Sequence, residues 1–238
     1  MIRAISFDLW FTLIWETKED EELYLRMRLE SLRSFLKEEG HEISLEVLKE
    51  AYSATKDFRM VVHPRELLRM LLAYIGFKLS DEALERVLLA YTSSTDGFVP
   101  KINEEALEVL PQLKSMGLRL ALVTNTSFGE RSVRAILRNV GLDLFDIIVT
   151  SCEAGFMKPQ RAIFSILLDK LGLDGSQVVH VGDSCYHDVI GATNAGLRAL
   201  HYPKLAHLAR HGRETCEGSF EKLENLNQLM GILGRWDR

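Results

Sequence analysis

The chain has 238 residues, 47% of them hydrophobic and 26% charged, which is the ordinary balance of a globular domain. A net charge of -5 without a basic face argues against a nucleic-acid partner, and no apolar run approaches the ~18 residues that would span a bilayer. The three cysteines, Cys152, Cys185 and Cys216, are widely spaced and include no CxxC pair. We therefore expect reduced thiols in a cytoplasmic protein without a signal peptide, and neither a disulfide framework nor a zinc site.

The first stretch of the chain, from Ile2 to Leu13, is rich in branched and aromatic residues and predicts a buried strand. Asp8 lies where the apolar part of this stretch ends. Burying an unpaired carboxylate is costly, so we expect Asp8 at the exit of the strand, where open parallel sheets place their ligand crevice. Asp8 is therefore a candidate nucleophile or metal ligand with the Thr12 hydroxyl nearby, although a turn-capping role is the simpler interpretation of these residues alone.

The next part of the chain has apolar residues at helical spacing and predicts no strand between about residues 15 and 97. The expected helices cover residues 19–40, 44–52, 64–76 and 80–91. The acidic run 19–22 is interpreted as the solvated first turn of the first helix, where the helix dipole favours negative charge. We expect residues 15–99 to form an all-helical cap domain, inserted into a core domain made of residues 1–14 and 100–238.

From residue 103 onward, predicted helices alternate with predicted strands. The expected strands cover residues 118–123, 147–149, 178–181 and 197–201, and the expected helices cover residues 103–117, 133–140, 162–171 and 189–195. This alternation predicts an α/β fold with a doubly wound parallel sheet and right-handed crossovers. The last thirty residues carry no motif.

Polar side chains follow four of the predicted strands or their loops: Asp8, Thr124, Lys158 and Asp183. Together they place two carboxylates, a hydroxyl and an ammonium group on one rim of the sheet. Two neighbouring carboxylates repel each other unless a cation lies between them, and Mg²⁺ suits one or two carboxylates together with a phosphate. Lys158 would compensate the charge of that phosphate, and Thr124 with backbone amides would hold its oxygens.

These stretches resemble, in their order and in their residues, the four motifs of the haloacid dehalogenase superfamily of hydrolases. The matching residues are 7–13 for the first motif, 122–125 for the second, 155–159 with 163–164 for the third, and 181–184 with Asp188, 191–192 and 195–196 for the fourth. The resemblance covers residues 1–14 and 100–205. The predicted helical insertion lies where this family carries its α-helical cap.

The resemblance implies that Asp8 attacks phosphorus and forms an aspartyl-phosphate. It also implies Mg²⁺ held by the carboxylates of Asp8 and Asp183 and by the backbone carbonyl of Trp10, with Asp188 behind these ligands, near Lys158 or a metal-bound water. The implied phosphate- and substrate-binding residues are Thr124, Asn125, Lys158 and Trp10.

Two positions depart from the family pattern. Trp10 stands where the family's phosphatases usually have the aspartate that serves as general acid and base, and Phe11 stands where they usually have glycine. An indole cannot exchange a proton in that role. The family's true haloacid dehalogenases, which use no metal, do carry an aromatic residue at this position, but they usually replace the Gly-Asp of the fourth motif, which is intact here as Gly182-Asp183.

We therefore favour a Mg²⁺-dependent phosphatase for small phosphate monoesters, slow or selective for good leaving groups. The alternatives are a metal-independent 2-haloacid dehalogenase and a phosphate-binding protein with weakened chemistry. The expected partner is a small phosphate ester, without nucleic acid or membrane; a monomer is the default and a dimer stays open.

Several further residues have both a functional and a simpler interpretation. His187 could replace the missing proton donor, but a solvent-facing position at a helix start is preferred. Cys185 is interpreted as a packed thiol. The basic residues Lys56, Arg59 and His63 could reach a substrate, but a solvated face is the simpler interpretation. Trp10 and Trp15 are expected to form pocket walls or to pack against the cap.

Overall fold

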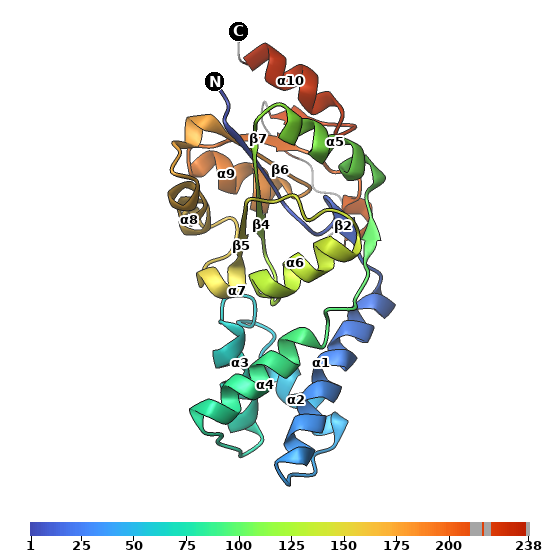
Figure 1. Ribbon diagram of the computed structural model, residues 1–238. Coiled ribbons are helices and arrows are strands. Elements are labelled where there is room, and N and C mark those ends of the chain that lie inside the picture. The colour runs from blue at the N-terminus through green and yellow to red at the C-terminus, as the bar shows by residue number, and fades with distance from the viewer. Residues whose placement is uncertain (210–215, 217–219, 237–238) are drawn as a thin grey trace.

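The computed structural model describes residues 1–209, 216 and 220–236, and its centre is a six-stranded sheet (Figure 1). The strands lie in the order β5-β4-β1-β6-β7-β8, and every neighbouring pair is parallel. Their bounds are Ala4–Phe7 (β1), Arg119–Thr124 (β4), Ile147–Thr150 (β5), Val178–Gly182 (β6), Arg198–His201 (β7) and Glu221–Lys222 (β8). This arrangement confirms the predicted α/β fold with a doubly wound parallel sheet.

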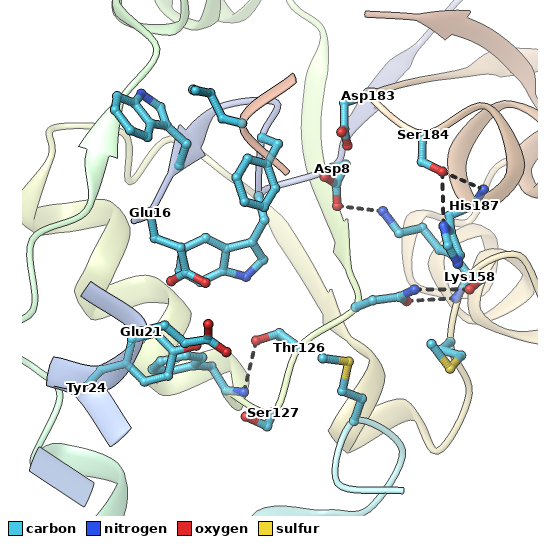
Figure 2. Close-up of a pocket in the computed structure, with 18 of the residues that line it drawn as sticks. Asp8, Glu16, Glu21, Tyr24, Thr126, Ser127, Lys158, Asp183, Ser184 and His187 are labelled. Atoms are coloured by element: carbon cyan, nitrogen blue, oxygen red, sulfur yellow. Dashed lines mark hydrogen bonds and ion pairs between the residues drawn. The ribbon is translucent and has the colours of Figure 1, made fainter. Parts of the chain in front are cut away.

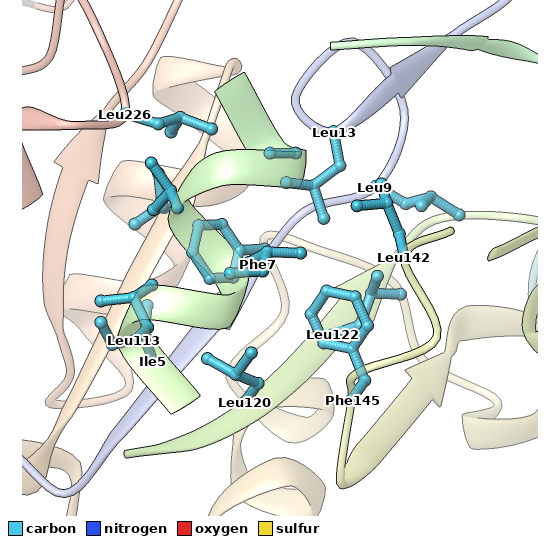
Figure 3. Packing of buried hydrophobic residues seen from close by; sticks show 14 of the residues in the cluster. Ile5, Phe7, Leu9, Leu13, Leu113, Leu120, Leu122, Leu142, Phe145 and Leu226 are labelled. Atoms are coloured by element: carbon cyan, nitrogen blue, oxygen red, sulfur yellow. The ribbon is translucent and has the colours of Figure 1, made fainter. Parts of the chain in front are cut away.

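Helices cover both faces of the sheet, which is why its central strands are mostly apolar. The helices α5 (Glu104–Ser115), α6 (Glu130–Asn139) and α10 (Gln228–Trp236) pack on one face, and α8 (Arg161–Leu171) and α9 (Gly191–Asn194) pack on the other. The short helix α7 (Ser151–Ala154) follows β5. Figure 3 shows Ile5 and Phe7 of β1 among leucines of α5 and β4, while Ala4 packs on the side of α8.

Four helices near the carboxyl ends of the strands form a separate bundle (Figure 1). They are α1 (Lys18–Glu38), α2 (Leu45–Ala54), α3 (Pro64–Tyr74) and α4 (Asp81–Ser93). Their apolar faces meet in a core of their own, which includes Leu32 and Leu68. Three of the helices begin where a hydroxyl side chain, from Thr17, Ser44 or Ser80, accepts a backbone N–H three residues on. The helical cap predicted from the sequence is therefore present, whereas its domain limits of 15 and 99 stay a prediction.

A two-stranded antiparallel ribbon, which the sequence did not predict, joins the bundle to the core. Its strands are β2 (Ile14–Trp15) and β3 (Lys101–Ile102). The ammonium group of Lys101 lies 2.6 Å from a carboxylate oxygen of Asp20 at the start of α1. The two crossings between core and bundle are thus held side by side.

Three features differ from the sequence predictions. The helix expected at 189–195 begins earlier and consists of a π-helical segment, η2 (Cys185–Ile190), followed by α9. Cys185 and Cys216 form a disulfide, so the prediction that all three cysteines are reduced thiols is wrong, as is the packed thiol expected at Cys185; Cys152 is free and buried. The C-terminal thirty residues supply β8 and α10.

No helix in the described part of the chain combines the length and apolarity needed to cross a membrane.

Candidate active site

Asp8 is the first residue after β1, and Lys158 and Asp183 lie close to it (Figure 2). Together with Asp188 these residues form a charged cluster. Lys158 Nζ lies 2.6 Å from Asp8 Oδ1 and 2.6 Å from Asp188 Oδ1. Asp183 directly follows β6, the strand next to β1. Carboxylate oxygens of the three aspartates lie within 4.8 Å of one another, and Thr12 donates a hydrogen bond to Asp8 Oδ2 over 3.3 Å. The order of the strands thus gathers residues that are far apart in sequence.

The loop that carries Lys158 is held by Asn125 at the end of β4. The Asn125 amide nitrogen donates to the backbone carbonyl of Lys158 over 3.0 Å, and the backbone N–H of Lys158 donates to the Asn125 side-chain oxygen over 2.8 Å. Such reciprocal hydrogen bonds fix the backbone from which the lysine side chain extends. Asn125 therefore positions Lys158, a role that the sequence did not suggest.

The members of the charged cluster titrate very differently. Burial raises the pKa of Asp8 to about 7. The attraction of Lys158 lowers this pKa, whereas repulsion by Asp188 and Asp183 raises it further. Burial also acts on Asp188, but its contacts with Lys158 and His180 hold the pKa of this carboxyl well below its usual value. Burial alone would lower the pKa of Lys158, yet its two carboxylate partners raise it. Asp188 and Lys158 are thus a fixed ion pair beside Asp8.

The donor set of the charged cluster fits a hard divalent cation. With three aspartates ionised and Lys158 protonated, the cluster carries a net charge of -2, which such a cation would balance. Carboxylate oxygens are the ligands that Mg²⁺ prefers in proteins. Asp188 already accepts from Lys158 and His180 at Oδ1 and from the Ser184 backbone N–H at Oδ2. A cation held by the other two carboxylates would therefore leave Asp188 behind it as a partner of Lys158.

A cavity of about 680 Å³ opens onto the charged cluster, and both the core and the helical bundle line it. The core contributes Trp10, Phe11, residues 125–128, Met157 and Leu208, and the bundle with its connection contributes residues 15–18, Glu21, Tyr24, Leu25, Tyr52, Arg59 and Met60. Aromatic rings form one wall, with the Phe128 ring centroid 6.1 Å from that of Trp10 and 5.0 Å from that of Tyr24. Trp10 and Trp15 line the cavity, which is one of the two roles predicted for them.

Phe11 adopts a backbone conformation that favours glycine. Its φ angle is 62°, the one positive value at a non-glycine position in the described part of the chain. The left-handed region costs an ordinary residue roughly 1–2 kcal/mol. The backbone N–H of Phe11 donates to the carbonyl of Ile14 over 2.6 Å and closes the loop. The loop after β1 therefore keeps a conformation suited to glycine although the residue is phenylalanine.

Some predicted residues lie elsewhere than expected. Thr124 is fully buried, its hydroxyl has no hydrogen-bond partner in the described structure, and the cavity wall is formed by the residues that follow it. His187 is half-buried and lines the cavity, with Ser184 Oγ 3.0 Å from its Nδ1, so the solvent-facing interpretation is wrong (Figure 2). Arg59 also lines the cavity, stacked over the Tyr52 ring, which corrects the interpretation as a solvated face.

The other two basic residues of that group follow the simpler interpretation. Lys56 and His63 are exposed, and His63 accepts the backbone N–H of Arg65 at the start of α3. Sequence reasoning missed two buried polar residues behind the charged cluster, Ser6 on β1 and His180 on β6. Each stands in the interior of an apolar strand, where the only signal was a polar residue in a buried run.

Gly182 is required at the end of β6, because an added Cβ would lie 2.2 Å from Asp188 Cγ. We expect Gly182→Ala to displace the Asp188 carboxylate and to cost about 1–3 kcal/mol in the free energy of unfolding through overpacking. Activity should fall with it, since Lys158 loses its fixed partner. Denaturant unfolding and initial rates measure both effects. Gly231→Ala on α10, where a Cβ meets nothing within 4 Å, is the matched control and should be neutral or stabilising.

The fold and the site define an α/β protein with a helical cap and a cluster of carboxylates and a lysine at the strand ends. Residues 2–196 match the sequence profile of the haloacid dehalogenase-like hydrolases. Because this match spans most of the chain, the protein belongs to that hydrolase family, as its motifs predicted.

The relatives of this chain include two kinds of hydrolase. A glyceraldehyde 3-phosphate phosphatase of Pyrococcus abyssi is 29% identical over 236 residues, which is 97% of this chain and 94% of the relative. A protein of the same name from Methanopyrus kandleri is 29% identical over 200 residues, 83% of this chain and 82% of its own. The solved structure of a 2-haloacid dehalogenase from Pseudomonas syringae aligns with 99% of this chain and 100% of its own, with a TM-score of 0.67 and 26% identity.

Proposed function

We propose that the protein is a Mg²⁺-dependent phosphatase that hydrolyses small phosphate monoesters through an aspartyl-phosphate on Asp8. The observation that carries the proposal is the charged cluster, in which three carboxylates converge within 4.8 Å beside one buried lysine. A cluster with net negative charge attracts a phosphate dianion only when a cation is present. The phosphatase names of relatives that align along most of the chain support the same reaction.

In this proposal Asp8 Oδ attacks phosphorus, the ester oxygen leaves, and water then hydrolyses the aspartyl-phosphate. Lys158 lies 2.6 Å from the attacking carboxylate and compensates the charge of the phosphoryl group. Thr124 and Asn125 are assigned to phosphate orientation. Asn125 lines the cavity, whereas the Thr124 hydroxyl, which has no hydrogen-bond partner among the described residues, lies behind the cavity wall. Mg²⁺ held by Asp8, Asp183 and the Trp10 carbonyl would balance charge on the phosphoryl oxygens.

The rival function is metal-independent dehalogenation of 2-haloacids. Trp10 and the alignment with a 2-haloacid dehalogenase structure favour it. The retained Asp183 argues against it, because an additional carboxylate beside Asp8 would repel the anionic substrate and the nucleophile unless a cation were bound. A third candidate, a phosphate-binding protein without turnover, follows from the same missing proton donor at Trp10.

One panel of substrates distinguishes the three functions. We expect release of phosphate from aryl and alkyl monoesters in the presence of Mg²⁺, and a loss of about 10²-fold or more when a chelator removes the metal, with recovery when Mg²⁺ is restored. Metal-independent halide release from 2-chloropropionate, with phosphate esters untouched, would contradict the proposal. Binding of inorganic phosphate without turnover of any ester would support the third candidate instead.

We further propose that residues 15–99 act as a cap that closes the cavity and contacts the organic part of the substrate. Trp15 pairs with Lys101 across the ribbon, so the ends of the insertion are adjacent and a short linker can replace residues 17–97. We expect this variant to keep a folded core and to change its relative rates across the ester panel by tenfold or more (about 1.4 kcal/mol). Unchanged preferences in a folded variant would contradict a role for the cap. A monomeric state belongs to the same proposal. A cytoplasmic location stays a prediction from the sequence, and the disulfide between Cys185 and Cys216 removes the reduced thiols on which that prediction rested.

A further inference from the structure

A chain of buried hydrogen bonds leads away from the charged cluster into the sheet. His180 Nε2 lies 3.0 Å from Asp188 Oδ1, the same oxygen that contacts Lys158. On the other side of the imidazole, Nδ1 lies 2.8 Å from Ser6 Oγ. The parallel register of β1 and β6 sets Ser6 directly beside His180, and both side chains are fully buried. Neither residue reaches the cavity, so neither can touch a substrate.

The chemistry of the partners fixes where the protons are. An ionised Asp188 only accepts hydrogen bonds, so His180 Nε2 must carry the ring proton. The imidazole is neutral, because burial lowers the pKa of His180 even though Asp188 opposes the shift. Nδ1 is then an acceptor, and the Ser6 hydroxyl donates to it; the other acceptor near Ser6 Oγ, the carbonyl of Val179, is 3.5 Å away. Asp188 thus selects the tautomer, and Ser6 satisfies Nδ1 and holds the ring with Nε2 facing Asp188.

In the described part of the chain, Asp188 Oδ1 has hydrogen-bond contacts with Lys158 and His180 alone. Asp188 Oδ2 is held by the Ser184 backbone N–H over 3.0 Å, and the backbone at Gly182 leaves no room behind the carboxylate. The imidazole itself is fixed by an edge contact with the Phe164 ring, whose centroid is 5.2 Å away. A carboxylate oriented in this way presents Oδ1 to Lys158 in one geometry.

We propose that Ser6 and His180 are positioning residues that hold Asp188 as the second partner of Lys158. The consequence rests on the proposed function: when a phosphate arrives at Asp8, Lys158 keeps one fixed carboxylate and stays aimed at the reacting group. Without the hydrogen bond from His180, Asp188 can turn, and Lys158 then pairs more closely with Asp8, which weakens the nucleophile. The loss should fall on the chemical step and leave substrate binding nearly unchanged.

The test compares variants that differ in one hydrogen-bond donor. His180→Gln keeps an N–H near the position of Nε2, whereas His180→Leu removes it. We expect His180→Leu to lower kcat by about 10–100-fold with KM changed less than about threefold, and His180→Gln to recover most of the loss. Val178→Ala, which opens a cavity on the same face of β6, is the control for destabilisation alone and should keep wild-type kcat. If Leu and Gln variants lose activity equally, or if Val178→Ala matches His180→Leu, the proposal is wrong.

A second measurement does not depend on turnover. The ¹⁵N chemical shifts of the imidazole report which nitrogen carries the proton, and we expect the Nε2–H tautomer at His180 in the wild-type protein. Ser6→Ala should retain the Nε2–H form, because the Asp188 carboxylate still accepts from Nε2, and should change the imidazole shifts only through the lost donor to Nδ1. An Nδ1–H tautomer in the wild type would overturn the proposal. Absence of phosphatase activity together with the expected tautomer would refute the proposed function and the consequence for kcat, but leave the orientation of Asp188 supported.

Discussion

Asp8→Asn should abolish turnover of every phosphate ester, with a loss of at least about 10³-fold in kcat, because an amide cannot act as the attacking nucleophile. The side chains have the same shape, and the Asn oxygen can still accept a hydrogen bond from Lys158, which lies 2.6 Å from Oδ1 in the wild type. The measurement is the rate of phosphate release under saturating Mg²⁺. Trapping of a phosphorylated enzyme by acid quench should succeed with the wild type and fail with Asp8→Asn.

Thermal melts show whether the variant tests chemistry or folding. Asp169→Asn, on an exposed position of α8, removes the same charge outside the site and should leave both activity and stability unchanged. If Asp8→Asn melts with the wild type and still turns over within tenfold (about 1.4 kcal/mol), a different group attacks phosphorus, and the assignment of Asp8 fails whatever the metal dependence is.

The charged cluster could be predicted because of where its members stand in the sequence. Asp8 and Asp183 each follow an apolar strand directly, and the carboxyl ends of parallel strands meet at one edge of the sheet. Five of the six strands of the sheet could be predicted because helices bury both faces and these strands are mostly apolar, whereas β8 has no apolar residue and was not predicted. Position in the sequence was therefore enough to predict that Asp8 and Asp183 lie at one rim of the sheet.

The contacts behind the rim could not be predicted in the same way. Ser6 and His180 are 174 positions apart, and the sequence of neither strand indicates the register that places them side by side. The disulfide between Cys185 and Cys216 joins residues 31 positions apart, a spacing that matches no motif. Arg59 was interpreted as part of a solvated basic face, yet it follows α2 in a turn and lines the cavity. Each case depends on tertiary packing.

The residue at position 10 has consequences for rate that can be tested directly. Positioned acid-base catalysis is typically worth about 10²–10⁴-fold, so its absence should leave alkoxide leaving groups unassisted. Esters of phenols, whose oxyanions are stable, should react much faster than esters of sugars or simple alcohols. The indole lines the cavity two residues beyond Asp8 and is half-buried against the Phe128 ring. A carboxylate introduced there would face the same space as the leaving group.

Trp10→Asp should therefore raise kcat on alkyl phosphates, by about 10²-fold or more, and change kcat on aryl phosphates less. Trp10→Asn is the matched control, because it has the same shape as the aspartate variant and cannot transfer a proton. Both variants lose the indole, and because Trp10 is half-buried the cost should be below the ~3–5 kcal/mol of a fully buried tryptophan. Thermal melts and Mg²⁺ titrations of both variants accompany the kinetics. If Trp10→Asp folds, binds Mg²⁺ and is no faster than Trp10→Asn on any ester, another group already moves the proton; His187, which lines the same cavity, is then the residue to replace.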